Sequence, residues 1–336
     1  MNSEATAHSP SWIIATLRRW INTSFTLCGL GLLLATLLGF AGRWHWALDL
    51  LSHFRLQFLT GACAMLFIAG WARHVLCIAL FAGAVLVNGA CVAPYLPFAP
   101  TAPSSQERLK LMSINSFFHN QSLDQLAHSV RTVDPDIVFC CEMLARNKRE
   151  SAEWIAEFPY QVLDNRHETM LLSKIPIVKS EFRSGHHASR SQPVAEFEWR
   201  GRRFTVAGMH TRTPTGRVSA SIRNIELDSM ASWIRTQDAT PLLLVGDWNI
   251  TPYSPVFQHF LQEAQLQDAR VGKGIMTSWG LGIRRKKESF LQRLTQIPID
   301  HCAYSAGVEI ASFSTGPPTG SDHLPIVIEF WLTDPQ

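Results

Sequence analysis

Runs of hydrophobic positions divide the chain into two parts that follow different patterns. Before residue 94, three apolar stretches lack any charged side chain, at about residues 21–42, 56–72 and 75–93. A membrane-spanning helix needs about 20 mainly apolar residues, so the pattern predicts three transmembrane helices within a membrane region over residues 1–93. The second stretch is short, which leaves a buried or re-entrant segment as its alternative. A cleaved signal peptide is the alternative for the first, although its apolar run is longer than a signal core.

Proline then separates this region from the rest of the chain. Pro94, Pro97, Pro100 and Pro103 precede Ser104-Ser105, a composition typical of extended and non-helical chain. We therefore predict a linker over residues 94–105, which spaces a soluble domain starting at residue 106 away from the bilayer.

From residue 106 to residue 336, short apolar runs alternate with helical patterns. Strands are predicted at Leu109–Ile114, Asp136–Cys141, Met170–Ser173, Val194–Trp199, Phe204–Met209, Leu242–Val245, Ile299–Tyr304 and Ile326–Leu332. Helices are predicted after Ser122, where Leu123, Leu126, Ala127 and Val130 recur at helical spacing, over Arg217–Thr236, and from about Ser254 to Gln265. This mixture predicts a layered α/β domain with a sizeable core.

Charge is distributed as unevenly as hydrophobicity. Residues 1–105 hold five Lys or Arg and two acids, a net charge of +3, whereas residues 106–336 hold 25 of each sign. Positive residues flank the apolar stretches almost evenly, so orientation is only weakly specified, and we favour a cytoplasmic N-terminus. With an odd number of spans, that choice places the soluble domain outside the cytoplasm. The seven cysteines show no disulfide or thiolate-metal spacing, which predicts free thiols.

Polar residues stand where the predicted strands end. Asn115, Glu142, His210 and Asp247 each follow an apolar run, and Asp322-His323 precedes the last one. Strand ends on one sheet edge lie close in space, so these side chains are expected to converge on one pocket. Alone, Glu142 could be a surface carboxylate and Asn115 a turn residue.

Such a set suits the hydrolysis of a phosphoester, which needs a divalent cation, amide donors and a base. Glu142 is the hard oxygen ligand that Mg²⁺ prefers. In an extended segment, Asp247 and Asn249 point together into the pocket while Trp248 turns into packing, although an ordinary Asx turn is the alternative. His323 supplies an imidazole suited to proton transfer at neutral pH, and Asp300 is its candidate carboxylate partner.

Together these segments resemble the endonuclease/exonuclease/phosphatase superfamily, which includes exonuclease III-like nucleases, DNase I, inositol polyphosphate phosphatases and neutral sphingomyelinases. The resemblance covers residues 109–332 and rests on six short motifs in the expected order. They are Asn115, Glu142, Gly208-Met209-His210-Thr211, Gly246-Asp247-Trp248-Asn249, Ile299-Asp300-His301 and Ser321-Asp322-His323. The resemblance implies a four-layer α/β sandwich of two packed mixed sheets flanked by helices.

The same resemblance implies a metal site. Glu142, assisted by Asn115, would hold Mg²⁺, with Mn²⁺ as the alternative ion, and Asp322 would approach the same cation.

It also implies catalytic roles. His210 and Asn249 would contact the phosphate, and Asp247 would orient the attacking water or help to protonate the leaving group. His323, steered by Asp300, would act as the general base, and water would attack phosphorus in line without a covalent enzyme intermediate.

Departures from the nuclease pattern bear on the substrate. Phe117 stands where abasic-site nucleases carry an acid, and His210 stands where they carry a Tyr, which looks like the sphingomyelinase, phosphatase and DNase I side. Nucleic-acid binding normally shows a basic stripe, but the soluble part is neutral. Its one dense cluster, Arg284-Arg285-Lys286-Lys287, reads as a solvated loop or a phosphate-attracting lid. His186-His187 and Arg190 carry no recognisable role.

A membrane anchor raises the effective concentration of a hydrolase near membrane-borne esters. The lipid bilayer and a phospholipid or other membrane-associated phosphate are therefore the first expected partners. An extracytoplasmic nuclease or a nucleotide or sugar phosphatase is the second hypothesis, and a catalytically silent membrane binding protein is the third. No protein partner is evident.

Overall fold

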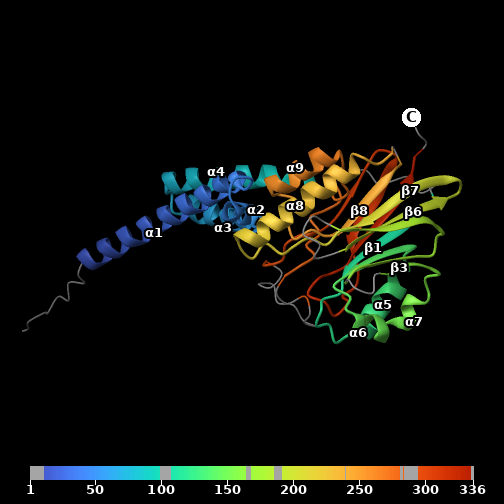
Figure 1. The fold of residues 1–336 in the computed structure, drawn as a ribbon. Coiled ribbons are helices and arrows are strands. Elements are labelled where there is room, and N and C mark those ends of the chain that lie inside the picture. Colours follow the sequence, from blue (N-terminus) through green and yellow to red (C-terminus); the bar gives the residue numbers. More distant parts are fainter. Residues whose placement is uncertain are drawn as a thin grey trace, which may run out of the picture.

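The computed structural model describes residues 11–98, 107–163, 168–184, 191–238, 240–280, 283 and 294–333. Between residues 11 and 98, all the regular elements are helices joined by short turns (Figure 1). The elements are α1 (Ser11–Leu38), the 3-10 turn η1 (Gly39–Ala41), α2 (Trp46–Ser52), α3 (Arg55–Trp71), α4 (Val75–Val92) and the 3-10 turn η2 (Ala93–Tyr95).

Two of these helical segments, Trp12–Ala41 and Val75–Tyr95, are long and apolar enough to cross a membrane. The helices α2 and α3 make a third candidate only if they count as one span, because the chain bends by 58° between them. The first segment also begins earlier than the predicted residue 21 and includes Arg18 and Arg19. Large apolar side chains on the outside of the bundle, such as Phe67 and Trp71, are 74% and 85% exposed, as expected for helices that face lipid.

The second part of the chain contains twelve named strands and five helices among the described residues. The strands are β1 (Leu109–Asn115), β2 (Ile137–Cys141), β3 (Tyr160–Leu163), β4 (Met170–Ser173), β5 (Ile177–Ser184), β6 (Ser191–Trp199), β7 (Arg202–Gly208), β8 (Leu242–Asp247), β9 (Gln267–Asp268), β10 (Asp300–Tyr304), β11 (Val308–Thr315) and β12 (Ile326–Leu332). The helices are α5 (Leu123–Val133), α6 (Ala145–Glu150), α7 (Ala152–Ile155), α8 (Arg217–Ile234) and α9 (Pro255–Ala264).

These strands form two six-stranded mixed sheets. The first sheet has the order β11-β12-β1-β2-β4-β3, and the second has the order β5-β6-β7-β8-β10-β9. Each sheet contains one parallel pair at its centre, β1 with β2 and β7 with β8, and its other pairs are antiparallel.

Apolar side chains between the sheets hold them face to face. Phe139 of the first sheet lies in one buried cluster with Phe197 and Phe204 of the second, whose rings stack with centroids 5.1 Å apart. A second cluster joins α8 and α9 to the second sheet, and a third joins α5 and α7 to the first. The layers are thus helix, sheet, sheet and helix (Figure 1), which confirms the predicted four-layer α/β sandwich.

All eight predicted strands and all three predicted helices of this domain are present, with ends shifted by a few residues. The strands β3, β5, β9 and β11 were not predicted. Most of β5 is exposed at the edge of its sheet, so its sequence lacks the continuous apolar run that identified the buried strands.

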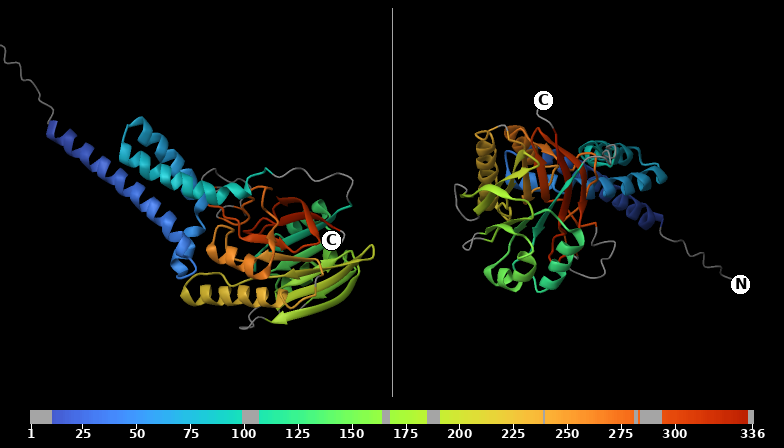
Figure 2. Two further views of the ribbon diagram at one scale, coloured as in Figure 1. Left: turned by 90° about the horizontal axis from the view of Figure 1, so that it is seen from above. Right: turned by 90° about the vertical axis from the view of Figure 1, so that its right-hand side faces the viewer.

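The N-terminal helical region (residues 11–98) packs directly on the α/β domain. Asp49 of α2 accepts a hydrogen bond from Arg223 of α8 at 2.7 Å, and His53 Nδ1 lies 3.0 Å from the hydroxyl of Thr251. Tyr95 packs edge-on against Tyr253, with ring centroids 5.5 Å apart. The two parts are therefore in direct contact here (Figure 2). The predicted linker would instead have kept them apart. Residues 99–106, which include most of that linker and the predicted domain start, lie outside the described residues.

Candidate active site

The predicted site residues come from both sheets. Asn115 ends β1 and Glu142 follows β2 in the first sheet, whereas Asp247 ends β8 and Asp300 begins β10 in the second. The expectation of a single sheet edge was therefore wrong. The two sheets lie face to face, so residues at the ends of their central strands come close together at one end of the sandwich.

A glycine makes room for this convergence. Gly246 has φ +144°, and a Cβ atom there would lie 2.0 Å from the carbonyl oxygen of Met209. Only glycine accommodates both this backbone conformation and this close approach between the ends of β7 and β8.

Asn115 joins the two carboxylates at the centre of the site. Its Nδ2 donates to Glu142 Oε1 and to Asp247 Oδ2, both at 3.0 Å, and its Oδ1 accepts from the amide of Phe117 at 3.0 Å. The second oxygen of Glu142 accepts from the amide of Phe118 at 3.2 Å. In this arrangement Asn115 orients the carboxylates through its NH₂ group.

His210 follows β7 of the second sheet and approaches the same two carboxylates. Its Nε2 lies 3.5 Å from Glu142 Oε1 and 3.7 Å from Asp247 Oδ2. The ligand atoms of Glu142, His210 and Asp247 lie within 4.8 Å of one another. Two hard carboxylate oxygens and one imidazole nitrogen form a donor set that fits a divalent cation. Asp322 lines the same cavity but belongs to neither ligand cluster found among the described residues.

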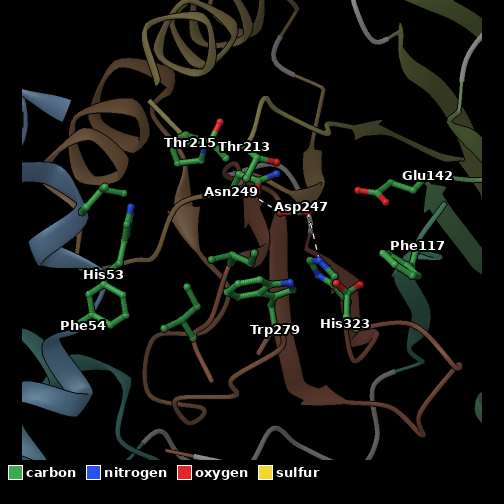
Figure 3. A pocket seen from close by; sticks show the side chains of 15 residues that line it. His53, Phe54, Phe117, Glu142, Thr213, Thr215, Asp247, Asn249, Trp279 and His323 are labelled. Atoms are coloured by element: carbon green, nitrogen blue, oxygen red, sulfur yellow. Dashed lines mark hydrogen bonds and ion pairs between the residues drawn. The ribbon is translucent and has the colours of Figure 1, made fainter. Parts of the chain in front are cut away.

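His323 and Asp300 are hydrogen-bonded, as the sequence predicts. His323 Nδ1 lies 2.8 Å from Asp300 Oδ2, and His323 Nε2 lies 3.7 Å from Asp247 Oδ2. Asp300 is 1% exposed, so its charge is little screened by water. The carboxylate therefore selects the tautomer that carries a proton on Nδ1 and directs Nε2 towards Asp247 (Figure 3).

Burial and these short distances perturb both titrating groups. Burial raises the pKa of Asp247 to about 7, although the charge of His323 opposes the shift. Burial by itself would lower the pKa of His323, but the carboxylates of Asp300 and Asp247 outweigh it and raise that pKa to about 10. The protein's own charges therefore favour a protonated His323 at neutral pH.

The Asp247–Asn249 segment reaches the cavity by a turn. Asn249 has φ +49°, and its amide donates to Asp247 Oδ1 at 2.9 Å. The expectation of an extended segment was wrong, and the Asx turn left as the alternative is present. Both side chains nevertheless line the cavity. Trp248 is buried, as predicted, and packs against Phe257 and His301.

Buried hydrogen bonds between Arg270, His301 and the backbone of Ile250 stabilise the segment that follows this turn. Arg270 Nη1 lies 3.0 Å from His301 Nδ1, and His301 Nε2 lies 2.7 Å from the carbonyl oxygen of Ile250. Burial lowers the pKa of His301 well below its usual value, and nearby Arg270 adds to the shift. A neutral His301 that accepts from Arg270 and donates to Ile250 satisfies both contacts.

The catalytic groups open into a cavity of about 450 Å³, a size typical of small-ligand sites. Phe117 and Trp279 line it, and so do Leu50, His53 and Phe54 of the N-terminal helical region (Figure 3). The sequence did not predict that this helical region contributes to the cavity. Its one signal was the pair of polar residues Asp49 and His53, which are spaced i, i+4 among apolar neighbours.

Two sequence features lie outside the described residues. They are the basic cluster Arg284-Arg285-Lys286-Lys287 and the group His186, His187 and Arg190.

Comparison with known proteins agrees with this geometry. The model of the Endonuclease/Exonuclease/phosphatase family matches residues 112–323. The chain belongs to this family. The predicted class of enzyme, a phosphoric ester hydrolase, is thereby confirmed. A search of curated proteins found no match.

Solved structures share the fold of the catalytic part at low identity. TDP2 of D. rerio, complexed with a single-strand DNA product, is 15% identical with a TM-score of 0.54, covering 67% of this chain and 100% of that one. The human Nocturnin catalytic domain with a bound sulfate anion is 17% identical with a TM-score of 0.52, covering 67% and 95%. A family protein from Bacteroides thetaiotaomicron is 15% identical with a TM-score of 0.55, covering 68% and 99%.

Proposed function

We propose that this chain is a membrane-anchored, divalent-metal-dependent phosphoesterase that acts on a phospholipid or another membrane-associated phosphoester. The observation that carries the proposal is the construction of the cavity. The carboxylate and imidazole groups of the catalytic domain share one cavity with Leu50 of α2 and with His53 and Phe54, which join α2 to α3. A substrate that reaches these catalytic groups therefore also contacts the membrane region.

Glu142 and Asp247 would hold the cation, and His210 would complete the ligand set or contact the phosphate. Asn115 keeps the two carboxylates pointing at one place, which lowers the cost of bringing like charges together. The expected ion is Mg²⁺, with Mn²⁺ as the alternative, and it would neutralise the phosphoryl oxygens and acidify the attacking water. Asp322 lines the same cavity and would add negative charge near the ion.

His323 would accept the proton of the attacking water at Nε2, because Asp300 already holds the proton on Nδ1. The charge of Asp247 is one cause of the raised pKa of His323. If Asp247 held a divalent cation, its charge would stabilise the imidazolium less, and His323 would become a better proton acceptor. Asn249 would donate to a phosphoryl oxygen, and Asp247 would also orient the water for in-line attack.

A nuclease is the second candidate, because a solved structure with the same fold holds a single-strand DNA product. Against it, residues 106–336 carry 25 positive and 25 negative side chains, whereas nucleic-acid sites are normally basic. With a cytoplasmic N-terminus and an odd number of spans, either activity would lie outside the cytoplasm.

A substrate panel tests the proposal. The full chain in detergent is assayed with Mg²⁺ against phospholipids, oligonucleotides, nucleotides and phosphomonoesters, with His323→Ala as the control. We expect phospholipid hydrolysis that requires the metal, and a kcat at least about 10²-fold lower in the variant, the usual contribution of a positioned base. Faster cleavage of oligonucleotides would favour the nuclease, and inactivity on every substrate would favour a binding protein.

A further inference from the structure

The active-site cavity has two chemically different ends. Figure 3 shows Glu142 at one side, His53 and Phe54 at the other, and Trp279 between them. The end formed by the membrane region is apolar, because Leu50 and Phe54 line the cavity together with Ile297 and Ile299. A phosphate would bind at the carboxylate end with its cation, so the other end must receive a different part of the substrate.

His53 adds one polar group to this apolar end. The amide of Thr251 donates to His53 Nδ1 at 3.2 Å, so Nδ1 is an acceptor and Nε2 carries the proton. His53 is 5% exposed, and its Nε2 has no hydrogen-bond partner among the described residues. The carboxylate oxygen Asp49 Oδ2 lies 3.9 Å from His53 Nε2, which is too far for a hydrogen bond. Buried donors are rarely left unsatisfied, so this N–H fits an oxygen acceptor of a ligand.

The position of this wall fits a ligand that comes from the bilayer. His53 and Phe54 form the bend between α2 and α3, at the end of α3 that faces the catalytic domain. From there α3 continues as an apolar helix whose outer side chains, such as Phe67, are exposed. Phe54 lines the cavity and is 42% exposed, so the apolar end of the cavity reaches the surface where α3 begins.

We propose that Leu50, His53 and Phe54 form the subsite for the lipid portion of the substrate. Hydrocarbon next to the phosphate packs against Leu50 and Phe54, and an oxygen of the lipid, such as an ester carbonyl or a hydroxyl, accepts from His53 Nε2. The subsite makes the membrane region a determinant of specificity as well as an anchor. This inference rests on the proposed phosphoesterase function and names the class of substrate, an amphipathic phosphoester.

The test compares two substrates of the full chain in detergent with Mg²⁺. One is a short-chain phospholipid with two six-carbon acyl chains, and the other is the glycerophosphodiester with the same headgroup and no acyl chain. We expect wild type to prefer the first, and Phe54→Ala to lower the ratio of the two kcat/KM values about tenfold through lost apolar contact. Phe67→Ala, which removes a Phe from α3 away from the cavity, is the matched control and should leave the ratio unchanged.

An equal loss on both substrates would overturn the inference, since Phe54 would then only support the fold. A wild-type enzyme without preference for the acylated substrate would overturn it as well. If wild type cleaves neither substrate, the proposed function fails, and binding decides the inference separately. A non-hydrolysable phosphonate analogue of the short-chain phospholipid should then bind about tenfold more weakly to Phe54→Ala than to wild type, and equal binding would refute the subsite.

Discussion

The buried ion pair between Asp49 and Arg223 allows a quantitative prediction about what holds the N-terminal helices on the catalytic domain. Asp49 Oδ2 and Arg223 Nη2 are 2.7 Å apart, and each side chain is at most 2% exposed. At an effective dielectric constant of about 20, charges at this distance attract by roughly 6 kcal/mol. Desolvation offsets much of that attraction, but removing one partner leaves the other charge buried and unpaired.

We therefore expect Asp49→Ala to lower the free energy of unfolding by about 3–5 kcal/mol. Arg223→Met should have a similar effect. The double variant should lose at least about 2 kcal/mol less than the sum of the two single losses, because it buries no unpaired charge. Chemical unfolding of the full chain in a mild detergent measures all three values.

An exposed pair provides the control. Arg131 and Glu157 are also 2.7 Å apart, but their side chains are 46% and 43% exposed. Removing Glu157 should cost no more than about 1 kcal/mol, since water screens that pair. If the coupling energy between Asp49 and Arg223 is as small as that of the exposed pair, the buried contact does not hold the two parts together.

Four further predictions concern the active site. Asp300→Asn should lower the pKa of His323 from about 10, because it removes the carboxylate charge that contributes most to stabilising the imidazolium. NMR titration of EDTA-treated protein measures this pKa, and an unchanged value would contradict the assignment. In wild type the imidazolium stabilises the fold fully below pH 6.5, the ordinary histidine pKa, and this stabilisation is lost as the pH rises towards 10. Gly246→Ala should destabilise the domain by more than about 3 kcal/mol, since its Cβ would lie 2.0 Å from the Met209 oxygen; a melting temperature close to that of wild type would show that the strand ends can separate. Glu142→Gln should weaken Mn²⁺ binding at least about tenfold by loss of a charged ligand, and equal affinity in calorimetry would remove Glu142 from the metal site.

The sequence by itself determined the layered fold and the chemical identity of the site. Buried strands such as Ile137–Cys141 are continuous apolar runs, and such runs are recognisable without any partner. The motif residues could be found because each lies at the end of such a run. The sequence also indicated that Asp300 would pair with His323, since an imidazole base needs a carboxylate to fix its tautomer.

Only the tertiary structure decided which groups share the cavity. Edge strands such as Ile177–Ser184 are exposed and carry little periodic signal. The bend at His53 and Phe54 joins the catalytic cavity although these residues lie almost 200 positions before Thr251, and no local pattern encodes a contact at such separation. Hydrophobic periodicity reports whether a residue is buried, whereas the packing of distant segments determines what it is buried against.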